Sequence, residues 1–267
     1  MSRIVLSIEY DGSGFEGWQS QPHGRTVQDV LQTAIAEIAG HEIALSCAGR
    51  TDTGVHATVQ IAHFDTDMTR PLSAWVRGVN AHLPGTVCVR WAQEVDDSFH
   101  ARFSAYARRY RYVLLNRPVR PAILAGKVGW QHAPLNLPRM QDAAHHLLGE
   151  HDFSAFRAAQ CQANSPVRVL NLASVRRVGD LIVFDFEANG FLHHMIRNLV
   201  GALIFIGKGE AESAWMAELL KMKDRQLAPP TFSPAGLYLC GVSYPDRWHL
   251  PGEGRIIATP AIVLQTP

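Results

Sequence analysis

The sequence predicts an α+β fold of two similar lobes, each an antiparallel sheet with helices packed on one face. Runs in which apolar side chains alternate with others, as in half-buried strands, recur along the chain. Stretches with apolar residues at helical spacing separate these runs, and short turns containing glycine join neighbouring strands directly. Strands joined by tight hairpins and mixed with helices are typical of antiparallel sheets covered by helices.

The first expected strand covers residues 3–10, whose alternate side chains are large and apolar, and the glycine-containing run after it ends the strand. Thr26 and Asp29 then have the spacing of a helix cap, and apolar residues repeat at helical spacing as far as Gly40. The rest of the first half is expected to contain strands at 43–47, 58–65 and 87–93, with a helix at 72–83 between the last two.

The second half repeats this order of elements. The expected elements are a strand at 109–115, a helix at 138–148, strands at 168–177 and 181–188 joined through Gly179 and Asp180, helices at 192–206 and 213–222, and a strand at 237–244. We therefore expect an N-terminal lobe over residues 1–105, a C-terminal lobe over 106–247 and a loosely packed extension over 248–267.

Composition indicates a globular protein, because 47% of the 267 residues are apolar and can build a sizeable core. The 25 Lys and Arg residues nearly balance the 24 Asp and Glu residues, so a nucleic acid would have to bind a local basic surface. The four cysteines are widely spaced and fit neither a disulfide framework nor a zinc site, and no segment has the apolar length of a membrane span. We expect a cytoplasmic protein without a membrane partner.

The densest group of polar functional side chains is the run AGRTDTGVH at residues 48–56, directly after an expected strand. Two glycines and two threonines together with Arg50, Asp52 and His56 indicate a tight loop, a common place for binding groups. A turn in which Asp52 caps its own backbone would use the same residues. The run lacks the lysine and the glycine spacing of a phosphate-binding loop, which disfavours nucleoside triphosphate binding.

Tyrosines and arginines alternate at the start of the strand expected at 109–115. Tyr110 and Tyr112 must share one face of this strand, and Arg109 and Arg111 share the other. Rings that stack on bases and guanidinium groups that contact phosphate suit a nucleic acid. The alternative is that the tyrosines pack in the core and the arginines face solvent.

The helix expected at 192–206 buries an apolar stripe, which leaves His193, His194, Arg197 and Asn198 on its other side. An arginine in that position serves either a binding site or contact with solvent. This segment alone does not decide between the two.

Five separated motifs together resemble the tRNA pseudouridine synthase A family: YDGSGFEGWQSQP, GRTDTGVHA, FHARFSA with RRYRYVLLN, FLHHMIRNLVG and APPTFSPAGLYL. They follow the order of that family and span residues 3–247. The resemblance implies two similar lobes that flank a basic catalytic cleft, a homodimer, and uridine at positions 38 to 40 of the tRNA anticodon stem-loop as substrate.

The resemblance also implies roles for individual residues. Asp52 resembles the family's catalytic carboxylate, Tyr110 its stacking tyrosine, and Arg197 the basic partner of the aspartate. Arg50 resembles the residue that helps to open the stem and holds the flipped nucleotide. We expect phosphate contacts from further arginines, namely Arg25, Arg102, Arg109 and Arg111.

Pseudouridine formation moves the uracil from its N1 to its C5 on the same ribose carbon, so there is no net redox change and no group is lost. Neither a cofactor nor a metal is therefore expected. A carboxylate suits this reaction as a nucleophile toward the sugar or the base, or as a base toward the sugar. We expect Arg197 to stabilise the ionised Asp52, as an opposite charge within about 4–6 Å does, and Tyr110 to stack on the uracil.

Two other functions remain open from the residues alone. A metal-dependent hydrolase is one, because residue types that bind metals lie close in sequence: His56, His63, Asp65 and Asp67. A non-catalytic RNA-binding module is the other, since it would also carry stacking tyrosines and arginines. Asp52 separates the enzyme from the module, because a pure binding surface gains nothing from a carboxylate in an arginine-bearing loop.

Overall fold

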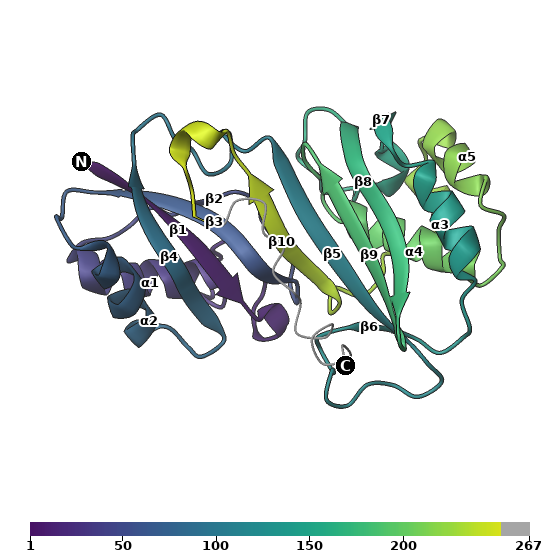
Figure 1. Cartoon of the computed structure of the whole chain (residues 1–267), viewed down its shortest axis with the longest axis horizontal. Coiled ribbons are helices and arrows are strands. Elements are labelled where there is room, and N and C mark those ends of the chain that lie inside the picture. The colour runs from purple at the N-terminus through teal and green to yellow at the C-terminus, as the bar shows by residue number, and fades with distance from the viewer. Residues whose placement is uncertain (252–267) are drawn as a thin grey trace. The chain divides into compact units, whose positions relative to one another are not determined.

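The computed structural model describes residues 1–251, which form ten strands and five α-helices in two compact units (Figure 1). The first unit combines residues 1–106 with residues 238–251, and the second comprises residues 107–237. The expected α+β class is confirmed. No helix within the described part of the chain is both long enough and apolar enough to cross a membrane.

The sheet of the first unit has the strand order β4-β1-β3-β10, with β2 paired to β3. β1 lies between β4 and β3 and is antiparallel to both, whereas β10 pairs in parallel with β3, Tyr238 lying opposite His56. The elements of this unit are β1 (Ser2–Tyr10), α1 (Val27–Ala39), β2 (Ser46–Cys47), β3 (His56–Thr66), α2 (Val79–His82), β4 (Val87–Val95) and β10 (Leu237–Ser243).

Helix α1 begins and ends as the sequence predicts. The Thr26 side chain accepts a hydrogen bond from the Asp29 backbone N–H, and the Asp29 side chain accepts one from the Thr26 backbone N–H. Gly40 ends the helix with a φ of 74°, a left-handed conformation that glycine adopts readily. The helix expected at 72–83 is confirmed over residues 72–82, where a π-helical stretch over Ala74–Gly78 runs directly into α2.

The sheet of the second unit has the strand order β5-β9-β8-β7, with β6 parallel to β5. β8 and β9 form the hairpin expected through Gly179, whose φ is 56°. Three helices lie on one side of this sheet (Figure 1), and most residues of α4 are buried. The elements are β5 (Ala107–Asn116), β6 (Gly129–Gln131), α3 (Leu137–His145), β7 (Gly149–Asp152), β8 (Val167–Val178), β9 (Leu181–Ala188), α4 (Met195–Gly207) and α5 (Trp215–Met222).

The last described segment, residues 238–251, belongs to the first unit because β10 pairs with β3. The sequence expectation placed it, as far as residue 247, in the C-terminal lobe. Periodicity identifies a strand but not the strand that pairs with it. Residues 252–267 of the expected extension lie outside the described residues.

Candidate active site

The Asp52 loop (residues 48–55) lies in the first unit, between β2 and β3. Its start is fixed to β3, because the Ala48 N–H donates to a strand carbonyl at 2.8 Å and the Gln60 side chain donates to the Gly49 carbonyl at 2.6 Å. Gln60 is fully buried, so water does not compete for this bond. The expectation of a tight loop directly after a strand is confirmed.

Thr51 fixes the middle of the loop from the position next to Asp52. Its carbonyl accepts the Trp18 N–H at 3.0 Å, and its hydroxyl lies 2.8 Å from the Tyr10 hydroxyl. Thr51, Trp18 and Tyr10 are all buried. Backbone and side chain of Thr51 are therefore both held, and the backbone that carries Asp52 has little freedom to move.

Two glycines allow the segment after β1 to pass close to this loop. A Cβ at Gly12 would lie 1.9 Å from the Val55 carbonyl oxygen, and a Cβ at Gly17 would lie 2.9 Å from the Thr51 carbonyl oxygen. Gly17 also has a φ of 88°, which other residues rarely adopt. A side chain at either position would therefore displace the loop.

His56 follows the loop as the first residue of β3 and is buried. Its Nδ1 accepts the Gly12 N–H at 3.0 Å and lies 3.2 Å from a carboxylate oxygen of Asp11. Its ring stacks on the Tyr238 ring with centroids 4.6 Å apart. Burial raises the pKa of the Tyr238 hydroxyl, so this partner stays uncharged. These contacts of His56 therefore hold the end of the Asp52 loop in place.

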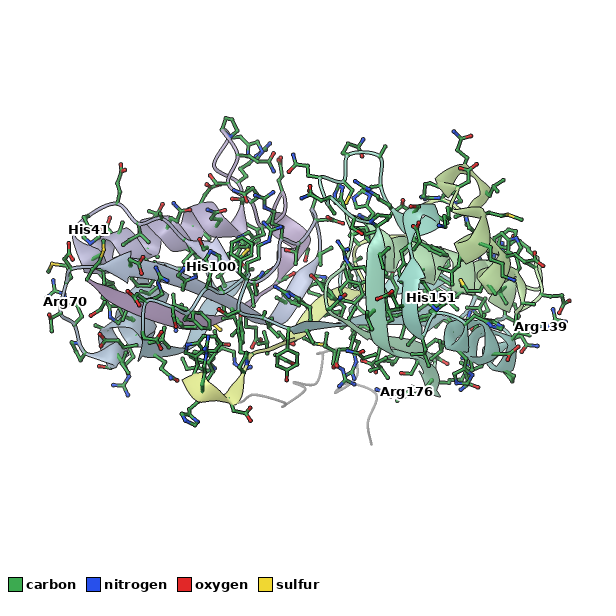
Figure 2. The ribbon with its side chains drawn as sticks, turned by 90° about the horizontal axis from the view of Figure 1, so that it is seen from above. His41, Arg70, His100, Arg139, His151 and Arg176 are labelled. Carbon is green, nitrogen blue, oxygen red and sulfur yellow. The ribbon has the colours of Figure 1, made fainter. Side chains whose placement is uncertain are left out.

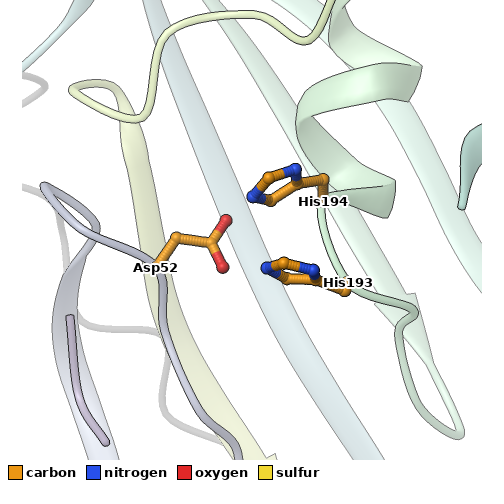
Figure 3. A group of neighbouring side chains, drawn as sticks. All are labelled: Asp52, His193 and His194. Carbon is orange, nitrogen blue, oxygen red and sulfur yellow. The ribbon is translucent and has the colours of Figure 1, made fainter. Parts of the chain in front are cut away.

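The Asp52 side chain is partly exposed, and Arg50 in the same loop is exposed. Figure 3 shows the Asp52 carboxylate directed away from the ribbon that carries it. The loop thus presents a carboxylate and a guanidinium while its backbone is fixed from within. A firmly held carboxylate of this kind is suited to nucleophilic or general-base chemistry.

Tyr110 and Tyr112 lie two residues apart on β5 in the second unit, and both are buried. The Tyr110 ring packs edge-on against Phe191 with centroids 5.3 Å apart. Tyr112 is fully buried, and its hydroxyl donates to the Ser233 carbonyl at 3.0 Å. Packing in the core therefore describes Tyr112, whereas Tyr110 keeps a small exposed edge of 8%.

Arg111 has a different environment from the one the sequence suggests. It is 6% exposed and donates two hydrogen bonds to Asp185, its cross-strand neighbour on β9, at 2.8 and 3.1 Å. This pair overturns the expectation that Arg111 contacts phosphate, because its guanidinium is already satisfied inside the protein. Arg109 has a more exposed side chain, at 26%, and lies 4.0 Å from Glu187.

The other two arginines expected to contact phosphate lie in the first unit. Arg25 has a 69% exposed side chain and forms an ion pair with Glu16. Arg102 is exposed, and its guanidinium lies over the Phe103 ring, 5.5 Å from the centroid. Both arginines therefore stay at the surface of that unit.

Arg197 lies in the first turn of α4, in the second unit. Its Nε donates to the Phe232 carbonyl at 2.8 Å, and the Phe232 N–H donates back to the Arg197 carbonyl at 3.3 Å. A polar network beside them joins this segment to the helix: the Thr231 hydroxyl and the Arg225 guanidinium donate to Asn198 Oδ1 at 2.7 and 3.1 Å. The expectation that Asn198 lies on the exposed side of this helix is wrong, because Asn198 is fully buried and its polar atoms are hydrogen-bonded inside the protein.

His193 and His194 precede α4, and their ring centroids lie 3.9 Å apart (Figure 3). His194 has a φ of 61°, which is uncommon for a residue other than glycine. This backbone conformation sets the direction in which the chain enters the helix that carries Arg197.

The residues considered as metal ligands have other partners. Asp65 accepts two hydrogen bonds from Arg3, at 2.7 and 2.6 Å. His63 Nδ1 accepts the Ala101 N–H at 3.2 Å, and burial lowers the pKa of His63 to about 4. Asp67 is exposed and lies 3.6 Å from the N-terminal amino group. With His56 held by Gly12, these contacts disfavour a hydrolytic metal site formed by the four residues.

A family model described as tRNA pseudouridine synthase matches residues 6–104 and 143–245, which make up most of the chain. The chain therefore belongs to the tRNA pseudouridine synthase family. Among curated members, the tRNA pseudouridine synthase A of Aromatoleum aromaticum is 63% identical over 97% of this chain and 98% of its own length. Its counterparts from Dechloromonas aromatica and Methylobacillus flagellatus are 62% and 58% identical over 93% and 95% of this chain, and over 95% and 97% of their own lengths.

Membership in the tRNA pseudouridine synthase family confirms the resemblance carried by the five motifs. The matched stretches include the Asp52 loop and Arg197. Tyr110 lies between them, in a part of the chain that the family model does not match.

Proposed function

We propose that the protein isomerises uridine to pseudouridine in tRNA, at positions 38 to 40 of the anticodon stem-loop, with Asp52 as the catalytic carboxylate. The observation that carries the proposal is the Asp52 loop, in which a partly exposed carboxylate stands on a backbone fixed by Thr51, Gly49 and Ala48. The family to which the chain belongs supports the substrate.

Asp52 acts where the bond between ribose C1′ and uracil N1 breaks and the bond between C1′ and C5 forms. The carboxylate either attacks the nucleoside or removes a proton from the sugar, and uracil departs as a stabilised anion before it rejoins through C5. The proton on C5 is then lost and N1 gains one, so atoms and electrons balance without a cofactor.

Arg197 and Tyr110 complete the proposed chemistry from the second unit. Arg197 is proposed as the cation that keeps Asp52 ionised, and its bond to the Phe232 carbonyl directs the guanidinium. Tyr110 is proposed to stack on the uracil and to accept the C5 proton. The target base must first leave its helix, at a cost of a few kcal/mol, and stacking offsets roughly 1–3 kcal/mol of it.

Arginines at the surface are proposed to hold the RNA. Arg50 would support the flipped nucleotide, and Arg25, Arg102 and Arg109 would contact phosphates. Affinity should then fall steeply with salt, because each phosphate contact releases counterions. We also propose that the protein is a homodimer in the cytoplasm, an assembly that sedimentation of the purified chain would test.

The proposed reaction is tested by tritium release from tRNA labelled at uracil C5, measured in the presence of a chelator. The wild-type chain should release tritium, and Asp52→Ala and Asp52→Asn should not, while both variants keep their affinity for tRNA. Absence of release by the wild type from several intact tRNAs would contradict the proposal. Full release in the chelator would exclude a metal-dependent reaction, whereas release that stops in the chelator would contradict a reaction without a metal.

A further inference from the structure

Segment 100–106 of the first unit carries a solvent-exposed aromatic side chain, Phe103, next to a cationic one, Arg102. Phe103 is 75% exposed, and Arg102 places its guanidinium over the ring. His100 adds a second flat ring, 4.4 Å from Phe103 between centroids. Single exposed apolar side chains are common at protein surfaces, so the exposure of Phe103 decides nothing by itself. Phe103 differs from such side chains because its backbone is held in place by hydrogen bonds.

The backbone before Phe103 is fixed by buried partners. The Ala101 N–H donates to His63 Nδ1 at 3.2 Å, and the Ala101 carbonyl accepts the Tyr244 hydroxyl at 2.6 Å. Ala101, His63 and Tyr244 are all buried. The segment is therefore tied to the core of the first unit immediately before its exposed residues.

The turn that carries Phe103 is closed by its own hydrogen bonds. The His100 N–H donates to the Ser104 hydroxyl, and the Ser104 N–H donates to the His100 carbonyl, both at 2.9 Å. The N–H groups of Arg102 and Phe103 both donate to His100 Nδ1, at 3.1 and 3.4 Å. The exposed ring thus stands on an ordered turn and has little backbone freedom to lose on binding.

The size and charge of this surface fit a nucleobase. Phe103 and Tyr106 are the exposed aromatic side chains of this segment, and together they offer at most about 500 Å² of surface, at 150–250 Å² for each aromatic side chain. A stable protein interface buries roughly 800 Å² on each partner, which is far more than such a surface offers. A flat ring beside a guanidinium matches the two parts of a nucleotide, since the ring stacks on a base and the cation meets a phosphate.

Arg102 lies in the same neighbourhood as the Asp52 loop. The Ala101 N–H donates to His63, and His63 lies opposite Ser46 of β2 in the strand pairing. Cys47 ends β2 and directly precedes the loop. The segment that carries Phe103 therefore lies beside the strand from which the Asp52 loop begins.

We infer that Phe103 and Arg102 form a second tRNA contact, at which the Phe103 ring stacks on an unpaired nucleobase other than the reacting uracil. This inference rests on the proposed function and adds a base contact in the first unit. Phe103 takes no part in bond making. It contributes to capture of the RNA and leaves the rate at saturation unchanged.

The test measures tRNA affinity and turnover for variants of Phe103 in the full chain. Phe103→Ala should raise the Kd and the KM for tRNA roughly 5- to 150-fold, the range expected for one lost stacking contact, with kcat unchanged. Phe103→Leu keeps apolar bulk without a flat ring and should lose affinity too, whereas Phe103→Trp should keep it. Ile123→Ala, at a 91% exposed apolar residue of the second unit, is the matched control and should behave as wild type.

Native affinity in Phe103→Ala, or in Phe103→Leu, would overturn the inference. So would a changed oligomeric mass of Phe103→Ala with unchanged tRNA affinity, because the ring would then belong to a protein interface. A failure of the proposed function would give a different result from a failure of this inference. A wild-type chain that releases no tritium, yet loses tRNA affinity when Phe103 is replaced, would remove the reaction and keep the contact.

Discussion

Gly12 lies so close to Val55 that a Cβ at position 12 would sit 1.9 Å from the Val55 carbonyl oxygen. Val55 ends the Asp52 loop, and Gly12 also donates its N–H to His56, the next residue along. Gly14 lies two residues further in the same turn, and a Cβ there would meet no heavy atom within 4 Å. The two glycines lie in the same turn but have different surroundings, so Gly14 can serve as the control for a substitution at Gly12.

Gly12→Ala should displace the Asp52 loop and lower turnover on the order of 100-fold, because a shift of about 1 Å in a catalytic group has that effect. Gly14→Ala should leave turnover within about twofold of wild type, since its surroundings are open. Tritium release at saturating tRNA measures both, and thermal unfolding shows whether each variant is folded. Equal turnover in the two variants would show that the contact with Val55 does not position Asp52.

Arg111→Ala should lower the free energy of unfolding by about 3 kcal/mol, because the buried Asp185 carboxylate then keeps only the half-exposed Arg176, 3.9 Å away, as a cation. Urea denaturation measures this change. Replacement of both partners, Arg111→Met with Asp185→Leu, should recover most of the loss, since no charge is then buried alone.

Arg109→Ala is the comparison on the same strand and should behave differently. Its side chain is 26% exposed, against 7% for Arg111, so its removal should cost less stability than that of Arg111. Its affinity for tRNA should fall, and the salt dependence of that affinity should become shallower by about one counterion. A variant that loses stability and keeps its salt dependence would place Arg109 in the core with Arg111.

Stability should fall as the pH drops from about 6.5 to about 4, because burial lowers the pKa of His63 to about 4 from about 6.5 in the unfolded chain. Between these values the unfolded chain binds a proton that the folded chain does not, so stability rises with pH in this window. His63→Asn keeps an acceptor for the Ala101 N–H and removes the titration. Its unfolding free energy should therefore vary less with pH.

Urea denaturation at a series of pH values between 4 and 7 measures the effect of His63. His146→Asn, at an exposed histidine of the second unit, is the control and should keep the pH dependence of the wild type. An identical slope in wild type and His63→Asn would assign the acid sensitivity to other groups.

Features that depend on residues close together in the sequence could be predicted, whereas features that depend on contacts between distant residues could not. Thr26, Asp29 and Gly40 fix the ends of α1 through residues three or four positions away or through their own conformation, so the sequence reveals them. The Asp52 loop was visible as a cluster of functional groups in nine residues. The partner of Arg111 is 74 residues away, and strand register decides that they meet. The alternation of side chains along the strand predicted which face of the sheet Arg111 lies on, but it could not predict that Asp185 lies on the same face beside it.

The contacts that hold the Asp52 loop could not be predicted for the same reason. Tyr10 reaches Thr51 over 41 positions, and Tyr238 reaches His56 only because β10 returns to β3. Arg50 and Asp52 lie together in the sequence, whereas residues that hold their loop, such as Tyr10 and Tyr238, lie far away in it.

Tyr110→Phe should lower turnover while tRNA affinity stays within about twofold, because the ring is kept and the hydroxyl proposed to accept the C5 proton is removed. Tyr112→Phe is the matched control on the same strand. It loses a hydrogen bond to the Ser233 carbonyl, which should cost about 1 kcal/mol of stability and no turnover. Unchanged turnover in Tyr110→Phe would leave Tyr110 with a stacking role only.

Arg197→Ala should reduce turnover on the order of 100-fold and affect tRNA affinity little, because a cation proposed to stabilise Asp52 matters mainly in the reaction. Arg197→Lys keeps the charge and loses the planar group that donates Nε to the Phe232 carbonyl, so its turnover should be intermediate. Single-turnover kinetics and filter binding separate the two quantities.

Arg139→Ala, at a surface arginine of α3, is the control for Arg197 and should match wild type (Figure 2). Thr231→Val tests the network beside Arg197: it removes the hydroxyl that donates to Asn198 and should lower turnover less than Arg197→Ala does. The smaller effect is expected because Thr231 acts on Arg197 only through the neighbouring Phe232, whose carbonyl accepts the Arg197 Nε–H. Turnover in Arg197→Ala as high as in Arg139→Ala would remove Arg197 from the mechanism, and the network would then serve only the packing of α4.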